Sequence, residues 1–322
     1  MIAAIRRKYG TPQDISIEEL PIPQPGPNEI LIRVLATTVN RTDVGVLTGL
    51  PFIFRFFVGF PKPRHLSPGT DFAGVVEKVG AQVTKYNEGD RVFGFHDHGN
   101  GSQAEYMTYD LKLPMAKIPD GLDFHTAVAS LEGAHYAINF INKVELNKGQ
   151  KVMLNGATGA IGSAALQILK AKGLVVTAVC GTGYLDKIKE LGADKVYDYQ
   201  TEDFTRDEDI YDFVFDAVGK SSFGKCKRLL KPDGAYISSD LGPRNENPFL
   251  AIWTAIRGGK KVIFPFPDNV QGSIDQMVEL LNAKKYHPLI DKVYPLEEIS
   301  NAYEYVASGQ KIGNVILDLT AD

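Results

Sequence analysis

The sequence contains only two cysteines, Cys180 and Cys226, among its 322 residues. Two thiols can form neither a framework of several disulfides nor a four-cysteine zinc site. The first ten residues, MIAAIRRKYG, lack the apolar segment and cleavage site of a secretory signal, so we expect a reducing cytoplasmic location. The longest apolar stretch, 51–61, is too short to span a bilayer and contains Arg55, so we expect no membrane insertion.

The sequence also lacks an excess of charge of either sign. Lys and Arg together number 35 and Asp and Glu 39, which gives a formal net charge of −4. Nothing in this balance favours binding to nucleic acid or to an anionic membrane. A length of 322 residues, with 44% hydrophobic residues, predicts a globular protein of about two domains.

The chain changes character near residue 120. Before it, segments such as 29–40 and 88–95 combine β-branched residues with turn-forming ones, which predicts mostly antiparallel strands. After it, apolar strands at 151–156, 174–181 and 211–219 alternate with helical segments, among which we include 224–234. This alternation predicts a parallel sheet covered by helices on both faces, and thus an α/β protein.

The segment KVMLNGATGAIGSAALQILKAKG, 151–173, predicts a dinucleotide-binding turn. A strand leads to three glycines spaced by three, and a helix follows. We expect Gly156 to turn the chain off the strand, Gly159 to let the backbone approach a pyrophosphate, and Gly162 to let the helix pack closely. Free N–H groups at the helix N-terminus favour the anion. The alternative is a tight strand–helix turn without a ligand.

The spacing G-x-x-G-x-x-G, preceded by a β-rich region, resembles that of the medium-chain dehydrogenase/reductase superfamily, in particular its zinc-independent quinone oxidoreductase-like branch. The resemblance extends over nearly the whole chain. It rests on the glycine segment and on ATTVNRTD (36–43), PGTDFAGVVEKVG (68–80), GDRVFGF (89–95), AEYM (104–107), LGADKVYDY (191–199), YDFVFDAVG (211–219) and KIGNVILDL (311–319).

The resemblance implies a GroES-like β domain plus a Rossmann domain with a doubly wound parallel sheet, and a cofactor cleft between them. The implied GroES-like substrate domain spans 1–120 and is completed by 290–322. The implied dinucleotide-binding domain spans 121–289. Relatives are often homodimers through pairing of Rossmann sheet edges, which would place AYISSD, 235–240, and its successors near the interface.

The resemblance also implies that no zinc is bound. Zinc-dependent members use a Cys, a His-Glu pair and a further Cys or His, but this chain has Asn40 at the Cys position and Gly69-Thr70-Asp71 at the segment with the His. An amide and a hydroxyl bind zinc poorly. The lobe with four structural cysteines is missing as well. His96 and His98 are two residues apart, but lack further nearby ligands, so a solvated loop is the simpler interpretation.

NADPH is the expected cofactor, with NADH possible. NAD-preferring sites place an acidic residue at the end of the second strand, whereas this strand ends with Cys180-Gly181-Thr182. Lys187 is the nearest cation, with a solvated helix face as the alternative role, and Tyr199 matches a family tyrosine beside the adenosine phosphate. The remaining cofactor contacts implied by the resemblance are Thr158, Ala160, Ile161, Val218 and Asn314.

For the chemistry, the resemblance places Asn40 and Asp43 at the nicotinamide end of the site, Asn40 as a hydrogen-bond donor. For Asp43 a structural capping role is the alternative. His135 replaces a Thr that contacts the nicotinamide ribose. It is a candidate proton donor, or else a buried structural histidine. Glu132 replaces a usually small residue. A Tyr followed by Lys four residues later, as in short-chain reductases, does not occur.

The function implied by the resemblance is NADPH-dependent, zinc-independent transfer of hydride to a quinone or an α,β-unsaturated carbonyl. We expect the substrate to be a small apolar molecule, and the aromatic run of residues 52–60 to form an apolar wall for it or to pack in the core. Alternatives are an enoyl-thioester reductase and a catalytically idle NADPH-binding protein. The aromatic run consists of Phe52, Phe54, Phe56, Phe57 and Phe60.

Overall fold

The computed structural model describes residues 1–50, 52 and 54–320, and of Phe54 and Phe57 only the backbone. The chain divides into two compact units. Unit 1 comprises residues 1–132, 270–282 and 287–320, and unit 2 comprises 133–269 and 283–286. None of the helices in the described ranges is long and apolar enough to cross a membrane.

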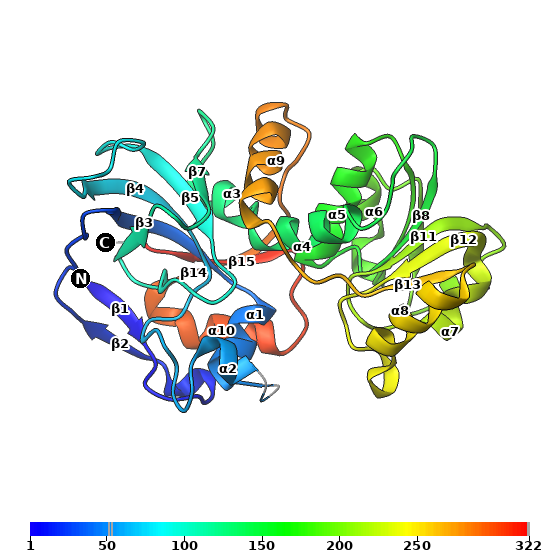
Figure 1. Cartoon of the computed structure of the whole chain (residues 1–322), viewed down its shortest axis with the longest axis horizontal. Coiled ribbons are helices and arrows are strands. Elements are labelled where there is room, and N and C mark those ends of the chain that lie inside the picture. Colours follow the sequence, from blue (N-terminus) through cyan, green and yellow to red (C-terminus); the bar gives the residue numbers. More distant parts are fainter. Residues whose placement is uncertain (51, 53, 321–322) are drawn as a thin grey trace. The chain divides into compact units, whose positions relative to one another are not determined.

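Unit 1 is built on a seven-stranded sheet in which most neighbours are antiparallel (Figure 1). Its order is β14-β15-β3-β4-β5-β7, and β6 also pairs with β3. The strands are β3 (Glu29–Val39), β4 (Asp71–Val79), β5 (Arg91–Phe95), β6 (Tyr106–Asp110), β7 (Met115–Lys117), β14 (Ile290–Pro295) and β15 (Asn314–Asp318), with β1 (Ile2–Ile5) and β2 (Ser16–Glu19) forming a separate pair.

Apolar clusters stabilise unit 1, and two of them are large. One lies on the sheet and includes Ile32, Phe72 and Tyr109; the other includes Tyr303 and Leu47. β3 is buried almost along its whole length, which agrees with its place in the middle of the sheet. The helices of this unit are α1 (Arg41–Thr48), α2 (Phe54–Val58), α3 (Phe124–Ala129), α9 (Val270–Asn282) and α10 (Ile299–Ala307), and α4 (Glu132–Ile141) begins in it and continues into unit 2.

Unit 2 contains a six-stranded sheet in which all strand pairs are parallel, as the alternation of strands and helices predicts. Its order, β10-β9-β8-β11-β12-β13, reverses direction at β8 and β11, which is the switch point where ligands bind in such sheets. The strands are β8 (Lys151–Asn155), β9 (Val175–Cys180), β10 (Lys195–Asp198), β11 (Tyr211–Asp216), β12 (Leu230–Ile237) and β13 (Lys261–Ile263).

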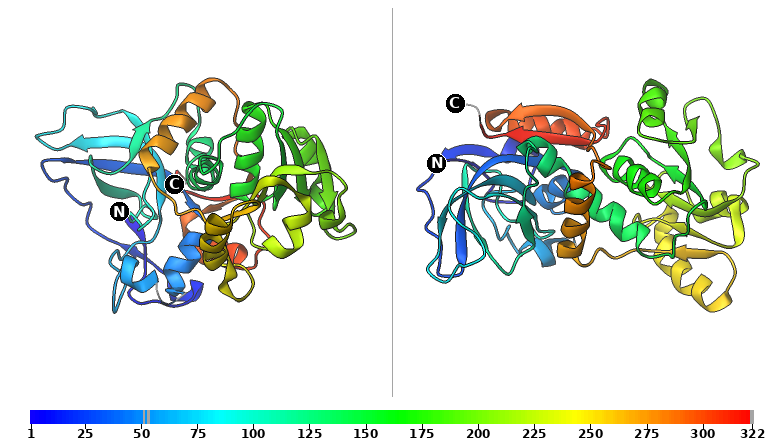
Figure 2. Two further views of the ribbon diagram at one scale, coloured as in Figure 1. Left: turned by 45° about the vertical axis from the view of Figure 1, so that its right-hand side comes forward. Right: turned by 90° about the horizontal axis from the view of Figure 1, so that it is seen from above.

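Helices that follow the strands along the chain pack against this sheet (Figure 2). They are α5 (Ala160–Ala171), α6 (Leu185–Glu190), α7 (Phe223–Cys226) and α8 (Glu246–Arg257). The helix expected over 224–234 is wrong in its second half, because β12 begins at Leu230. This strand pairs with β11 on one side and β13 on the other, so the tertiary ladder overrides the local helical pattern.

Candidate functional site

The glycine turn of unit 2 has the geometry that a dinucleotide needs. Gly156, directly after β8, has a φ of +87°, and a Cβ there would lie 2.7 Å from the Val218 Cβ. A Cβ on Gly162 would lie 2.1 Å from the Gly156 carbonyl oxygen, so helix α5 packs directly on the turn. At Gly159 the nearest atom would be 3.7 Å away. The first and third glycines thus shape the turn, and the second leaves its face open.

The N-terminus of α5 fits a pyrophosphate. Gly159 is the N-cap residue and has no side chain that could cap the first N–H groups, and the first turn contains no acidic residue. Thr158, Ala160 and Ile161 are only partly buried around this end. A bound dianion would accept hydrogen bonds from the uncapped N–H groups and would interact favourably with the helix dipole. These residues are therefore suited to hold the phosphates of a dinucleotide.

A buried carboxylate that the sequence interpretation missed holds the loop beside this turn. Asp216 ends β11 and accepts hydrogen bonds from the N–H groups of Gly219 and Ser221 at 2.9 and 3.0 Å. The Tyr236 hydroxyl and the Asn155 amide also donate to it, at 2.8 and 3.0 Å. Val218, which touches Gly156, belongs to this loop. An Asp directly at the carboxyl end of a central strand was the available signal.

A carboxylate from the neighbouring strand, that of Asp198, lies beside the end of β9. Cys180 is opposite Asp198 in the ladder between β9 and β10, and the Thr182 hydroxyl donates to Asp198 at 2.5 Å. The Asp198 carboxylate also accepts the Gln200 N–H at 2.9 Å, so it stabilises the turn after β10. The Tyr199 hydroxyl lies beside Gly181, where a Cβ would be 3.4 Å from it. The neighbouring strand thus supplies the carboxylate that is absent from 180–183.

Lys187 lies on α6 with a half-exposed side chain, and its nearest carboxylate is Glu190 at 3.9 Å on the same helix. Such an exposed ion pair contributes little to stability, so Glu190 binds the Lys187 ammonium only weakly. Asn314, the other peripheral cofactor candidate, belongs to unit 1, where its amide donates to the Leu289 carbonyl at 3.1 Å.

Unit 1 contains a buried polar network around Asn40. The Thr38 N–H and hydroxyl donate to the Asp71 carboxylate at 2.8 and 2.6 Å. The Asn40 amide nitrogen donates to the Thr38 hydroxyl at 2.7 Å and to the Glu132 carboxylate at 3.2 Å, and the Thr70 hydroxyl donates to the same Glu132 oxygen at 3.0 Å. Hydrogen bonds to protein atoms therefore occupy the residues at the two compared zinc-ligand positions.

Lys311 completes this network. Its ammonium donates to the Asn40 Oδ1 at 3.0 Å and to the Gly313 carbonyl at 2.8 Å. The contact joins residues 271 positions apart in sequence. It arises because β15 pairs with β3 in the register Val315↔Val39, and Lys311 and Asn40 lie just outside the two paired ends. The sequence interpretation missed Lys311, and only its place in the closing motif signalled it.

Burial changes the pKa of each ionisable group in this network. Burial raises the pKa of Asp71 to about 6 and that of Glu132 to about 7, where the Asp71 charge adds to the effect. Burial and the neighbouring Glu132 also raise the pKa of Asp43 well above its usual value. Burial lowers the pKa of Lys311 to about 8, against the opposing attraction of the carboxylates. Burial thus brings the pKa values of Asp71, Glu132 and Lys311 close to neutral pH.

The two other proposed catalytic residues have different surroundings. Asp43 is buried, and its carboxylate accepts the Asn40 N–H at 2.8 Å, as a cap of α1 would. His135 is buried in the part of α4 that belongs to unit 2, where the Asn139 amide nitrogen lies 3.3 Å from its Nδ1. Both geometries agree with the structural roles that the sequence left open, and neither excludes a chemical one.

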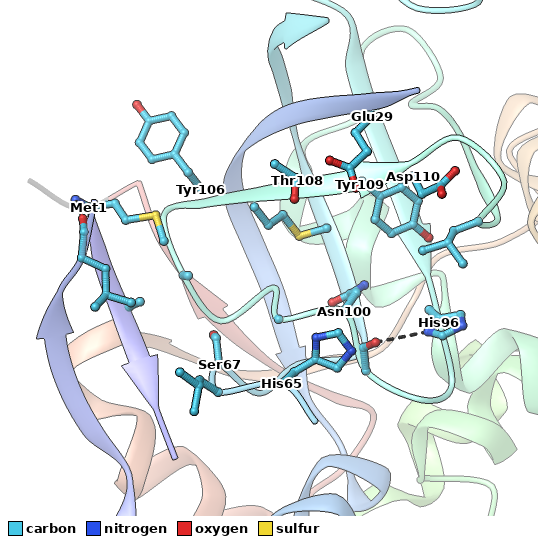
Figure 3. A pocket seen from close by; sticks show the side chains of 18 of the residues that line it. Met1, Glu29, His65, Ser67, His96, Asn100, Tyr106, Thr108, Tyr109 and Asp110 are labelled. Carbon is cyan, nitrogen blue, oxygen red and sulfur yellow. Dashed lines mark hydrogen bonds between the residues drawn. The ribbon is translucent and has the colours of Figure 1, made fainter. Parts of the chain in front are cut away.

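No group of three or more His, Cys, Asp or Glu side chains suited to a metal occurs among residues 1–50, 52 and 54–320. The rings of His96 and His98 have centroids 5.4 Å apart, and the Nδ1 of His96 is 3.2 Å from the Gly99 carbonyl oxygen. Figure 3 shows His65 and His96 in a hollow of about 400 Å³ in unit 1, whose lining does not include Asn40 or Lys311. The network residues do not fit a zinc ion.

Part of the aromatic run forms an exposed cluster in unit 1. The rings of Phe52, Phe56 and Phe60 have centroids 5.7–6.2 Å apart, and each residue is more than half exposed. The predictions for the Phe54 and Phe57 side chains lie outside the described part of the structure. The alternative that these side chains pack in the core is wrong for Phe52, Phe56 and Phe60, because their rings are exposed to water.

Two family models match parts of this chain. Residues 26–120 match the alcohol dehydrogenase GroES-like domain, and residues 191–317 match the zinc-binding dehydrogenase family model. A chloroplastic quinone-oxidoreductase homologue of Spinacia oleracea is 28% identical over 314 residues, which are 93% of this chain and 92% of that protein. The 2-methylene-furan-3-one reductase of Solanum lycopersicum is 28% identical, over 96% of this chain and 76% of that protein.

A third relative, a trans-enoyl reductase of Aspergillus terreus, is 28% identical over 91% of this chain and 87% of that protein. Among solved structures, the quinone oxidoreductase of Coxiella burnetii superimposes with a TM-score of 0.85 at 23% identity, covering 99% of both chains. A mycobacterial protein in complex with NADPH gives a TM-score of 0.80 at 23% identity, over 99% of this chain and 100% of that one.

Proposed function

Because the chain belongs to the medium-chain dehydrogenase/reductase superfamily and is an oxidoreductase, we propose that it reduces quinones or α,β-unsaturated carbonyl compounds with NADPH and without zinc. When bound, the nicotinamide supplies the hydride. The residues of the chain then have to bind the cofactor phosphates, orient the acceptor and provide a proton.

The observation that supports this proposal is the network around Asn40. An amide and a hydroxyl stand where zinc-dependent relatives have a thiolate and an imidazole, and both donate to Glu132. An alcohol or a simple ketone needs a Lewis acid or a strong proton donor to polarise its oxygen, whereas a quinone or enone is already electrophilic. Hydrogen-bond donors near the acceptor oxygen are sufficient for such substrates.

NADPH is the proposed cofactor because the segment 180–183 contains no carboxylate that would hold a ribose 2′-OH, and because Lys187 and Tyr199 are available to a 2′-phosphate. Asp198 opposes this preference. Its carboxylate is already bonded to Thr182 and Gln200, so we expect it to weaken the preference for NADPH without reversing it. The proposed places of Asn40, Asp43 and His135 at the nicotinamide end stay as the sequence predicts them, but the Asn40 amide nitrogen already donates to Thr38 and Glu132.

An enoyl-thioester reductase is the second candidate, favoured by the similarity to the Aspergillus trans-enoyl reductase. The chemistry is the same reduction of a conjugated double bond, and only the acceptor's tail differs. A CoA or phosphopantetheine tail requires cationic side chains at its phosphates. Arg55 of α2 is a candidate for that role, and its guanidinium lies 4.6 Å from the centroid of the Tyr9 ring.

The test is oxidation of NADPH and NADH at 340 nm by protein prepared without metal, against quinones, enones and an enoyl-CoA. We expect turnover of a quinone or enone, a lower KM for NADPH than for NADH, and no gain on adding zinc. Preference for the enoyl-CoA would select the second candidate. Tight NADPH binding with no turnover of any acceptor would refute the proposal and favour an idle binding protein.

A further inference from the structure

The Lys311 ammonium lies in a buried polar network and has no carboxylate partner at hydrogen-bond distance among the described residues. Its two hydrogen bonds go to uncharged oxygens, the Asn40 Oδ1 and the Gly313 carbonyl. A lysine that serves only stability would gain more from a direct ion pair, as Lys170 and Lys195 do with Asp194 and Asp207. The geometry of Lys311 therefore calls for another explanation.

An ammonium has three N–H donors, and two of those of Lys311 have partners among residues 1–50, 52 and 54–320. The third N–H has no partner in this part of the chain, and the residue as a whole is partly exposed. Asn40, which fixes the ammonium, is itself held by Thr38 and Glu132 through its other end. The orientation of the amide is thus determined, and with it the position of Nζ.

Several charged groups surround Lys311. Those that act on it are Glu132 of α4, Asp43 and Arg41 of α1 and Asp291 of β14, and Lys311 in turn acts on Asp71 of β4. The carboxylates favour the charged ammonium, whereas burial and Arg41 favour the neutral amine. Burial is the larger effect and brings the pKa to about 8, so the ammonium holds its proton at neutral pH and releases it readily.

We propose that Lys311 is the proton donor to the acceptor oxygen in the reduction described above. This inference rests on the proposed function. When an enone gains a hydride, a C–H bond forms at its β-carbon and an electron pair moves onto its oxygen. When a quinone gains a hydride on one oxygen, an O–H bond forms there and an electron pair moves onto the other oxygen. The Nζ–H bond of Lys311 then breaks, and its proton forms the O–H bond of the enol or hydroquinone. The neutral amine regains a proton from water, so one hydride and one proton reach the acceptor.

The same ammonium also explains how an enzyme without zinc stabilises the oxygen. Before the proton moves, its positive charge lies where negative charge develops on the acceptor. Asn40 is then a positioning residue that fixes Nζ, rather than a donor to the substrate. This assignment differs from the sequence interpretation, in which Asn40 itself donates.

The test compares Lys311→Met and Lys311→Arg with the wild-type enzyme, with Lys285→Met, an exposed lysine, as the control. We expect kcat of the wild type to fall as the pH rises through about 8, the pKa of the donor. In Lys311→Met kcat should fall about 100-fold at pH 7, with the affinity for NADPH unchanged. Lys311→Arg should retain its charge but lose this pH dependence, because a guanidinium does not release a proton.

Rescue separates a chemical role from a structural one. In Lys311→Ala, added methylammonium should restore part of kcat, and the restored rate should depend on the pKa of the amine used. If Lys311→Met fails to fold, the amine rescue of Lys311→Ala and the pH profile of a folded Lys311→Arg still decide the question. A kcat of Lys311→Met within threefold of wild type, or an unchanged pH profile in Lys311→Arg, would overturn the assignment.

The titration of Lys311 is also measured without turnover, by NMR of reductively ¹³C-methylated protein, with the resonance assigned by its loss in Lys311→Arg. A midpoint near 8 supports the proposal, and one near the ordinary lysine value of about 10.4 overturns it. The two hypotheses fail differently. A wild-type protein that reduces no acceptor refutes the proposed function, whereas an active enzyme with an unaffected Lys311→Met variant refutes only the role of Lys311.

Discussion

At the scale of single residues, Glu132 shows how burial determines chemistry in this protein. It is 5% exposed and lies among other carboxylates, and its partners Asn40 and Thr70 are uncharged donors. Burial therefore raises its pKa to about 7, far above the value of about 4.3 in an unfolded chain. Between these two values the folded protein binds more protons than the unfolded chain, so stability decreases as the pH rises through this range.

We predict that Glu132→Gln removes much of this loss of folding stability at high pH. Its melting temperature should exceed that of the wild type at pH 8, by an amount equivalent to about 1–3 kcal/mol, because the buried charge is absent. The difference should shrink towards pH 5, where Glu132 is protonated in the fold. Thermal unfolding of the two proteins, followed by circular dichroism between pH 5 and pH 8, measures the difference in stability at each pH.

The exposed Glu190→Gln serves as the matched control, since its side chain is 70% exposed and should show no such trend. A Glu132→Gln protein that is less stable than the wild type at pH 8 would contradict the prediction. It would mean that Lys311 compensates the charge that the carboxylate carries at this pH.

At the scale of elements, the turn between β8 and α5 makes separate predictions for two glycines. Gly159 has a φ of −69° and open space around its Cβ position, whereas a Cβ on Gly162 would meet the Gly156 carbonyl oxygen at 2.1 Å. The two positions thus distinguish binding of a ligand from packing of the helix.

Gly159→Ala should lose only about 1 kcal/mol of unfolding free energy, the cost of Ala at an N-cap. It should bind NADPH about tenfold more weakly, because the methyl group occupies the face that the pyrophosphate approaches. Gly162→Ala should lose stability and NADPH affinity together, since α5 has to move away from the turn. Calorimetric unfolding and NADPH fluorescence titration measure the two effects. Equal affinity in Gly159→Ala and the wild type would exclude this face as the phosphate site.

At the scale of the whole molecule, one face of α8 points to assembly. Phe249, Ile252, Trp253 and Ile256 follow one another at helical spacing, and each is between 58% and 81% exposed. A large apolar stripe of this kind is rare on a protein that stays monomeric. Strand β13, the neighbour of α8, is the edge of the parallel sheet. Both features favour the predicted homodimer.

We predict that the purified protein has twice the mass of one 35.3 kDa chain in size-exclusion chromatography with light scattering. The double variant Ile252→Glu/Ile256→Glu should be monomeric, because burying two carboxylates in an apolar interface is unfavourable. The exposed Ile210→Glu is the control and should remain dimeric. A monomeric wild type, or a double variant that remains dimeric, would contradict the role of α8.

The sequence by itself determined the features that depend on local order. The alternation of strands and helices after residue 120 predicted the parallel sheet, and the glycine spacing predicted a turn whose three positions differ as expected. The absence of a thiolate and an imidazole at 40 and 70 is likewise a matter of residue identity alone. Such features need no knowledge of distant contacts.

Only the tertiary structure decided which distant side chains meet. Asn40 contacts Lys311 because β15 returns to pair with β3, and Asp198 faces Thr182 because β10 adds to the edge of β9. The register of a ladder between segments far apart in sequence follows from the packing of whole faces, which no local pattern encodes. The pKa values of Glu132 and Lys311 follow in turn, since burial is a property of the fold and not of the residue.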